Sequence, residues 1–515
     1  MSRVFAGVDL VLVHPGDRHG VYQGLGASLS AIETPLWAGM VATVARDAGL
    51  RVAVVDAEAE NLSPHDVAER VRDLHAGVAA VVVYGHQPNA STQNMTMAEA
   101  VARSVREVAP LTRTLLLGGH VAALPELTLR DGASEFVAVG EGVYTAVALA
   151  FVVRDGALDP YGVPGLGWRG AGAGGEVVLN QSPRLMPTPA RCAYDLLPMG
   201  LYRAHNHHVG FGALGPRTPY ASIYTSLGCP YGCGFCPIQA PFRSGEAVAG
   251  LASAANSYRR MPPAEVVATV DHLVDHYGVT TIRISDELFI LNRGHVSAIC
   301  HFLAGRPYAD RLNLWCYARI DTIHLEDLGL LRDAGVRWIC YGIESADQEV
   351  LDSVGKGYAA ERTAEVVAAT ELAGIEVQAN YIVGLPLDTV ETVAATRRQC
   401  VELGTAAFNV YSAMAYPGSR LYNEAVASGT PLPAEWIGYS QHAWETTPLP
   451  TASLTSAEVL RLRDEFHVAV AGSSEYLSGV RRRFGPAAAD HVAREMTGRL
   501  PRRLLGDPRP SCETP

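Results

Sequence analysis

Six apolar runs of strand length, each followed by a helical pattern, dominate residues 219–427. The strands are expected near residues 220–226, 280–285, 312–318, 337–343, 376–383 and 406–412. The helices are expected near residues 263–277, 295–304, 325–334, 360–373, 389–403 and 420–427. Strands that alternate with helices form a parallel sheet, and eight such units close a barrel. Six units predict a partial (β/α)6 barrel whose functional residues follow the strands.

A shorter alternation of the same kind fills residues 1–150. Residues 8–14 form an apolar run that ends at Pro15-Gly16, as expected of a buried parallel strand. Two later strand patterns end in glycine-rich stretches at residues 118–120 and 140–142. This region is predicted to be a Rossmann-like doubly wound sheet, with its ligand at the carboxyl ends of the strands.

The other segments complete an α/β chain. Residues 151–218 are rich in Gly, Pro and Arg and are interpreted as an ordered linker. Residues 428–515 are expected to form a helical C-terminal region. The formal net charge of −12 argues against nucleic-acid and anionic-membrane partners. No signal peptide or membrane-spanning stretch is recognisable, so a cytoplasmic protein is expected.

Three cysteines, Cys229, Cys233 and Cys236, lie in one loop that is rich in glycine and proline. Thiolates that converge in a reducing compartment bind zinc or an iron–sulfur cluster. Zinc sites usually pair two C-x2-C knuckles, and no second knuckle lies nearby. A cluster held by three cysteines leaves one iron open for chemistry. A zinc site and three ordinary thiols remain the alternatives.

The C-x3-C-x2-C spacing, with Phe235 before the last cysteine, resembles the radical S-adenosylmethionine (SAM) superfamily. The resemblance implies a [4Fe-4S] cluster on the three cysteines and a six-unit barrel. It also implies that the open iron binds SAM, which is cleaved to a 5′-deoxyadenosyl radical. An external one-electron reductant such as flavodoxin or ferredoxin is implied as a partner.

Polar residues follow the barrel strands where this superfamily binds SAM. Asp286 and Glu287 occupy the place of the motif that binds the methionine amine, although its glycines are absent. Arg319 follows strand three and could pair with a carboxylate. Solvated loop charges and plain turn residues are the alternatives. The candidates are Asp286, Glu287, Arg319, Glu344, Ser345, Gln378, Asn380 and Gly384.

The N-terminal sheet, with residues 84–93 after its third strand, resembles the cobalamin-binding domain fused to many radical SAM enzymes. The cobalamin motif D-x-H-x-x-G is incomplete, because Tyr22 stands where the glycine after Asp17 and His19 should be. The radical SAM enzymes that this domain resembles commonly lack the motif, so the resemblance implies cobalamin bound without a histidine ligand, with His19 a plain loop residue. Ser91 and Thr92 could bond the corrin amides or cap the next helix. The cofactor-binding candidates here are Ser91, Thr92, Gly119 and Glu141.

Two clusters near the barrel have less certain roles. Histidines 205, 207 and 208 follow Tyr202 and could bind metal, but the sequence supplies no further ligand. Tyr439, His442 and Trp444 could line a substrate cavity, although aromatic clusters more often belong to the core.

The resemblance implies a cobalamin-dependent radical SAM methyltransferase. Such an enzyme transfers a methyl group from methylcobalamin to an unactivated carbon of a small-molecule substrate. The alternative is a cobalamin-dependent radical enzyme that rearranges, cyclises or epimerises its substrate, and a non-catalytic sensor is a third possibility. A methylthiotransferase needs a second cluster in its N-terminal domain, and no cysteine precedes Cys192.

Overall fold

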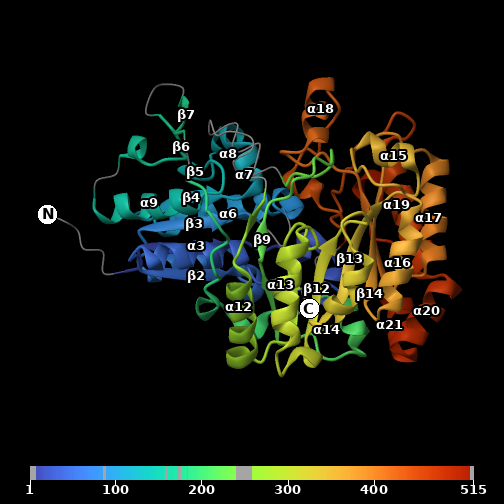
Figure 1. The fold of residues 1–515 in the computed structure, drawn as a ribbon. Helices are drawn as coiled ribbons and strands as arrows, with labels where there is room; N and C mark the ends of the chain where they lie inside the picture. Colours follow the sequence, from blue (N-terminus) through green and yellow to red (C-terminus); the bar gives the residue numbers. More distant parts are fainter. Residues whose placement is uncertain are drawn as a thin grey trace.

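The computed structural model describes residues 7–84, 88–130, 132–156, 159–170, 175–181, 184–238 and 258–510. Two α/β units lie side by side, the first in blue and cyan and the second in green to orange (Figure 1). Helices of the C-terminal region lie at the outer side of the second unit (Figure 1). No helix among the described residues is long and apolar enough to cross a membrane.

The N-terminal unit is a seven-stranded sheet in the order β2-β1-β3-β4-β5-β6-β7. The first five strands pair in parallel, which confirms the doubly wound sheet, while β6 and β7 pair antiparallel at the edge. The strands are β1 (Leu10–His14), β2 (Val52–Asp56), β3 (Val78–Val82), β4 (Arg113–Leu117), β5 (Phe136–Ala138), β6 (Leu166–Arg169) and β7 (Val177–Leu179). The linker prediction for residues 151–218 missed β6 and β7, because edge strands of three or four residues leave almost no periodic pattern.

Helices cover both faces of this sheet. Leu10 and Leu12 of β1 face α3 and α9, whereas Val11 and Val13 face α5 and α6. All four side chains are fully buried, which explains why the strand is a continuous apolar run. The helices are α1 (Arg18–Tyr22), α2 (Leu25–Ser28), α3 (Leu36–Asp47), α4 (Ala57–Glu60), α5 (Pro64–Asp73), α6 (Met95–Val108), α7 (Gly119–Ala123), α8 (Pro125–Arg130) and α9 (Val143–Arg154).

The second unit is a six-stranded parallel sheet in the order β15-β14-β13-β12-β11-β8. This confirms the partial barrel, whose open side lies between its edge strands β8 and β15. The strands are β8 (Tyr220–Ile223), β11 (Thr281–Ile284), β12 (Asn313–Ala318), β13 (Val336–Glu344), β14 (Glu376–Val383) and β15 (Ala407–Ser412). The helices are α12 (Pro263–Tyr277), α13 (Arg293–Ala304), α14 (Leu328–Asp333), α15 (Gln348–Ser353), α16 (Arg362–Leu372), α17 (Val390–Leu403) and α18 (Arg420–Ser428).

The C-terminal region is helical, as predicted, with α19 (Ser456–Ala471), α20 (Ser474–Phe484) and α21 (Pro486–Glu495). Helix α19 packs along edge strand β15, where Arg463 Nε donates a hydrogen bond to the carbonyl of Val410 at 2.8 Å. The region therefore covers part of the open side of the barrel.

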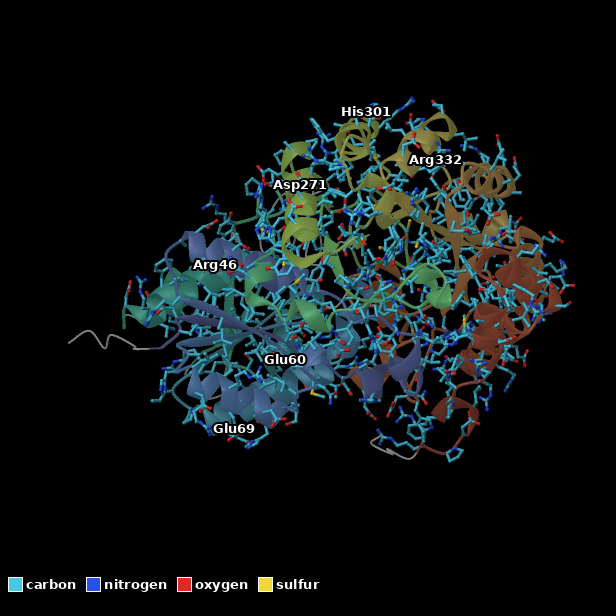
Figure 2. The ribbon with its side chains drawn as sticks, turned by 90° about the horizontal axis from the view of Figure 1, so that it is seen from below. Arg46, Glu60, Glu69, Asp271, His301 and Arg332 are labelled. Carbon is cyan, nitrogen blue, oxygen red and sulfur yellow. The ribbon has the colours of Figure 1, made fainter. Side chains whose placement is uncertain are left out.

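The N-terminal unit is joined to the barrel by buried polar contacts. Glu33 accepts hydrogen bonds from Tyr220 of β8 at 2.6 Å and from Arg283 of β11 at 2.9 Å. Tyr202 donates to Asp56 at the end of β2, at 2.8 Å. Charged side chains such as the half-buried Glu69 and the exposed Arg332 lie instead on the outer helices (Figure 2). The carboxyl ends of the N-terminal strands are thereby held against the barrel.

Candidate functional site

The three cysteines lie on the loop that leaves β9 (Ser226–Leu227), a two-residue strand paired with β10 (Arg259–Arg260). Gly228 starts this loop with φ of 86°, a conformation that favours glycine. All three cysteines are half-buried, and burial raises the pKa of Cys229 to about 11, with Glu287 and Cys233 adding to the rise. Among the described residues, no three His, Cys, Asp or Glu side chains are already arranged around one metal position.

Arg319, which follows β12, lies against this loop. Its Nη1 donates to Cys233 Sγ at 3.6 Å, and its guanidinium stacks over the Tyr231 ring at 3.8 Å. Asp321 fixes the same guanidinium through two contacts of 2.9 Å. Arg319 also acts against the rise in the pKa of Cys229, and so favours the thiolate form that an iron–sulfur cluster requires. Three thiols with a cationic neighbour therefore fit a cluster.

Asp286 and Glu287 follow β11 and differ in what they bind. Asp286 is fully buried and accepts hydrogen bonds from Thr225 and Ser226, at 2.5–2.7 Å. Glu287 Oε2 accepts from the backbone N–H of Gly228 at 3.0 Å, while its buried Oε1 has no partner within the described ranges. Burial raises the pKa of Glu287 to about 8. Glu287 is thus the carboxylate with room for a ligand ammonium, and Asp286 braces the start of the loop.

Glu344, the last residue of β13, forms a buried ion pair with Lys356, the single lysine of the chain. The Nζ–Oε1 distance is 2.6 Å, and the two side chains are only 6% and 7% exposed. Glu344 has φ of 66°, which is strained for a residue with a side chain. The sequence predicted that buried Glu344 needs a partner but did not identify this lysine, which lies 12 residues further on.

We expect Lys356→Met to lower the free energy of unfolding by about 3–5 kcal/mol, because the substitution leaves a buried carboxylate unpaired. Urea unfolding of the protein free of cofactors measures this change. The double variant Glu344→Gln/Lys356→Met removes both charges and should lose less than the single variant. A Lys356→Met protein as stable as the wild type would show that the pair is unimportant for the fold.

The other predicted cofactor-binding residues of the barrel lie either inside it or in the turns that follow its strands. Gln378 and Asn380 of β14 are hydrogen-bonded to each other at 3.2 Å inside the barrel. Ser345 is instead engaged in its own turn, where its Oγ accepts from the N–H of Asp347 at 3.2 Å. Gly384 has φ of 91°, and a Cβ there would meet Val459 of α19 at 2.4 Å. This contact gives Gly384 a packing role.

A cavity of about 1720 Å³, including its opening, lies inside the barrel and extends to the neighbouring units. Phe235 brings the cysteine loop to its wall, and Tyr22 and Gln93 belong to the N-terminal unit. His442 and Arg463 come from the C-terminal region. The inner wall is formed by barrel side chains, among them Arg283, Trp315, Tyr317, Gln378, Asn409 and Tyr411.

The histidines of residues 205–208 line this cavity instead of gathering around a metal. His207 and His208 both bond Gln378 Oε1 through Nε2, at 2.9 and 2.7 Å. His208 also lies 4.0 Å from the Trp315 ring. Of the predicted aromatic cluster, His442 is a lining residue, whereas Trp444 hydrogen-bonds the carbonyl of Asp507. The histidine cluster could therefore be recognised in the sequence, but its hydrogen bonds to Gln378 could not be predicted from it.

Two family models match the two sheets. The B12 binding domain matches residues 22–150, and the Radical SAM superfamily matches residues 223–400. The chain is a B12-binding domain fused to a radical SAM domain. The radical SAM domain implies a [4Fe-4S] cluster and SAM, and the B12-binding domain implies cobalamin.

Two relatives and one solved structure extend the likeness beyond the matched domains. An uncharacterized methyltransferase of Pyrococcus horikoshii is 26% identical over 441 residues, which are 84% of this chain and 86% of the relative. An anaerobic magnesium-protoporphyrin IX monomethyl ester cyclase of Cereibacter sphaeroides is 25% identical over 88% of this chain and 68% of its own length. The radical SAM methyltransferase TsrM of Kitasatospora setae, solved with cobalamin and a [4Fe-4S] cluster, shares the fold. Its TM-score is 0.61 at 19% identity, covering 91% of this chain and 88% of TsrM.

The cobalamin candidates of the B12-binding domain are held by internal bonds. Ser91 Oγ donates to the Val83 carbonyl and accepts from the N–H of His120, while Thr92 contacts the His120 ring at 3.2 Å. Neither caps a helix by a side-chain hydrogen bond. Glu141 is paired with Arg259 of β10, and Gly119 begins α7. Residues 85–87 of the predicted 84–93 segment lie outside the described residues.

Proposed function

We propose that this radical SAM enzyme methylates an unactivated carbon of a small-molecule substrate. The observation that supports it is the single cavity shared by the cysteine loop, the inner wall of the barrel and the B12-binding domain. Phe235 lines the cavity from the cysteine loop, where the cluster would bind. Tyr22 and Gln93 line it from the B12-binding domain, where cobalamin would bind. A substrate in this cavity is within reach of both cofactors.

The residues of this chain have distinct roles in the proposal. Cys229, Cys233 and Cys236 hold the cluster, with Arg319 beside Cys233. Glu287 Oε1 accepts a hydrogen bond from the ammonium of SAM, because in the part of the chain that the structure describes this carboxylate oxygen lacks a partner. When bound, the cofactors supply the radical and the methyl group, and an external one-electron donor completes the reaction.

The imidazoles of the cavity favour radical over acid–base chemistry. Burial lowers the pKa of His207 to about 3 and that of His467 to about 4. At neutral pH both rings are therefore uncharged and weakly basic, and they cannot ionise an unactivated C–H bond. Their part is to position the substrate by hydrogen bonds and to keep water out.

The products of SAM test the proposal. Anaerobic enzyme loaded with iron, sulfide and cobalamin is incubated with a reductant, a small-molecule extract and SAM labelled in its methyl group. We expect 5′-deoxyadenosine and S-adenosylhomocysteine to form together, and the label to appear in a new product. Labelled product without 5′-deoxyadenosine would refute the radical route.

The second candidate function is a radical reaction without methyl transfer. The similarity to the magnesium-protoporphyrin cyclase, over 88% of this chain, favours this alternative. In that case 5′-deoxyadenosine forms while S-adenosylhomocysteine and labelled product stay at background. The same incubation therefore decides between the two functions.

A further inference from the structure

Three charged side chains are buried together beside the cavity. Arg463, Asp464 and Arg502 are 5%, 3% and 0% exposed. Arg502 donates to both oxygens of Asp464, at 3.1 and 3.0 Å, and Arg463 Nη1 donates to Asp464 Oδ1 at 2.8 Å. Two guanidinium ions therefore share one carboxylate, and this triad carries one excess positive charge.

Arg463 and Asp464 both line the cavity, whereas Arg502 lies behind them. Its Nε is bonded to the carbonyl of Val410 and its Nη1 to Asp464. Within the part of the chain that the structure describes, no hydrogen bond satisfies its Nη2. A largely buried charge without full compensation is costly, so an anion in the cavity would stabilise it.

Two histidines extend the same wall. His442 and His467 line the cavity, and the buried Nδ1 atom of each has no partner among the described residues. Burial lowers the pKa of both imidazoles, and Arg463 lowers it further, so both rings are neutral and each has one N–H. The N–H of His467 is used toward the carbonyl of Met496, so His442 is the ring that can donate to an anion. Glu495 also lines the cavity. Its negative charge raises the pKa of His491, which burial lowers.

We propose that Arg463, with His442, binds a carboxylate or phosphate group of the substrate at the open side of the barrel. This inference rests on the proposed function, because that function places a substrate in the cavity. It narrows the substrate to small molecules with an anionic group. The rings of Tyr22 and Tyr411 line the same cavity and could pack against an aromatic part of the substrate.

The test uses the full chain loaded with cluster and cobalamin, with SAM present. Calorimetric titrations use benzoate and phenyl phosphate as anionic probes and benzyl alcohol as the uncharged control. We expect the wild type to bind at least one of the two anions and to bind the alcohol more weakly. Arg463→Gln should weaken anion binding about tenfold or more, because a charge-assisted hydrogen bond is lost.

Asp464→Asn is the matched variant. It removes the same Arg463–Asp464 ion pair but makes the triad more positive, so anion binding should strengthen by a few-fold. A purely structural role would change binding in the same direction in both variants. If Arg463→Gln fails to fold, His442→Gln should still weaken anion binding several-fold.

Three results would overturn the inference. The first is a wild type that binds the alcohol as well as both anions, or binds neither anion. The second is Arg463→Gln and Asp464→Asn changing anion binding in the same direction. The third is unchanged anion binding in Arg463→Gln with loss of SAM or cobalamin, which would assign the anion to a cofactor. Failure of the proposed function is detected separately, by the products of SAM.

Discussion

Replacing Cys229, Cys233 or Cys236 by alanine is expected to lower the iron content from about four atoms per chain to a small fraction of that value. A cluster held by two thiolates loses a strong ligand and does not survive desalting. Formation of 5′-deoxyadenosine from SAM should fall to the background of a protein-free control. Iron and sulfide assays, together with chromatography of the SAM products, measure both effects.

Cys300→Ala is the matched control for these variants. Cys300 is buried in α13, and burial raises its pKa to about 12, so it is an inert thiol. Iron content and 5′-deoxyadenosine formation should therefore stay at the wild-type level. A variant of the triplet that keeps about four irons and still cleaves SAM would contradict the assignment of the cluster ligands.

The two sheets could be predicted from the sequence because their strands are buried on both faces. Helices on either side make β1 an unbroken apolar run, and the six barrel strands repeat the same pattern. The antiparallel strands β6 and β7 were missed because short edge strands carry little apolar periodicity. The sequence thus predicts strands that are buried on both faces, because they are continuous apolar runs, and it predicts short edge strands less well.

The cysteine triplet is a local feature, and its spacing alone indicated the cluster loop. The contacts that shape the rest of the site join residues far apart in the chain. His207 meets Gln378 across 171 residues, and Arg502 meets Asp464 across 38. A single sequence gives no periodic signal for such pairs. Asp286 and Glu287 are adjacent in the sequence, and their roles could be distinguished only by the hydrogen bonds that each one makes in the structure.

Glu287→Gln is expected to weaken the binding of SAM to the cluster-loaded protein roughly a hundredfold, about 3 kcal/mol. The reason is that the carboxyl group of Glu287, whose Oε1 has no partner among the described residues, can ionise when the ammonium binds, whereas the amide stays neutral. The fold should be little affected at pH 7. The pKa of Glu287 is raised from its ordinary value to about 8, so its carboxyl group is mostly protonated there and resembles the amide.

Asp286→Asn should behave in the opposite way. Asp286 accepts hydrogen bonds from Thr225 and Ser226, so the amide disturbs the start of the cysteine loop and lowers stability and cluster content. SAM binding, measured by equilibrium dialysis and expressed per cluster, should then stay near the wild-type value. Loss of SAM affinity in Asp286→Asn together with normal affinity in Glu287→Gln would exchange the two roles. Both carboxylates are buried on the same turn. The two variants are expected to differ because, among the described residues, Glu287 Oε1 has no hydrogen-bond partner, whereas both oxygens of Asp286 have one.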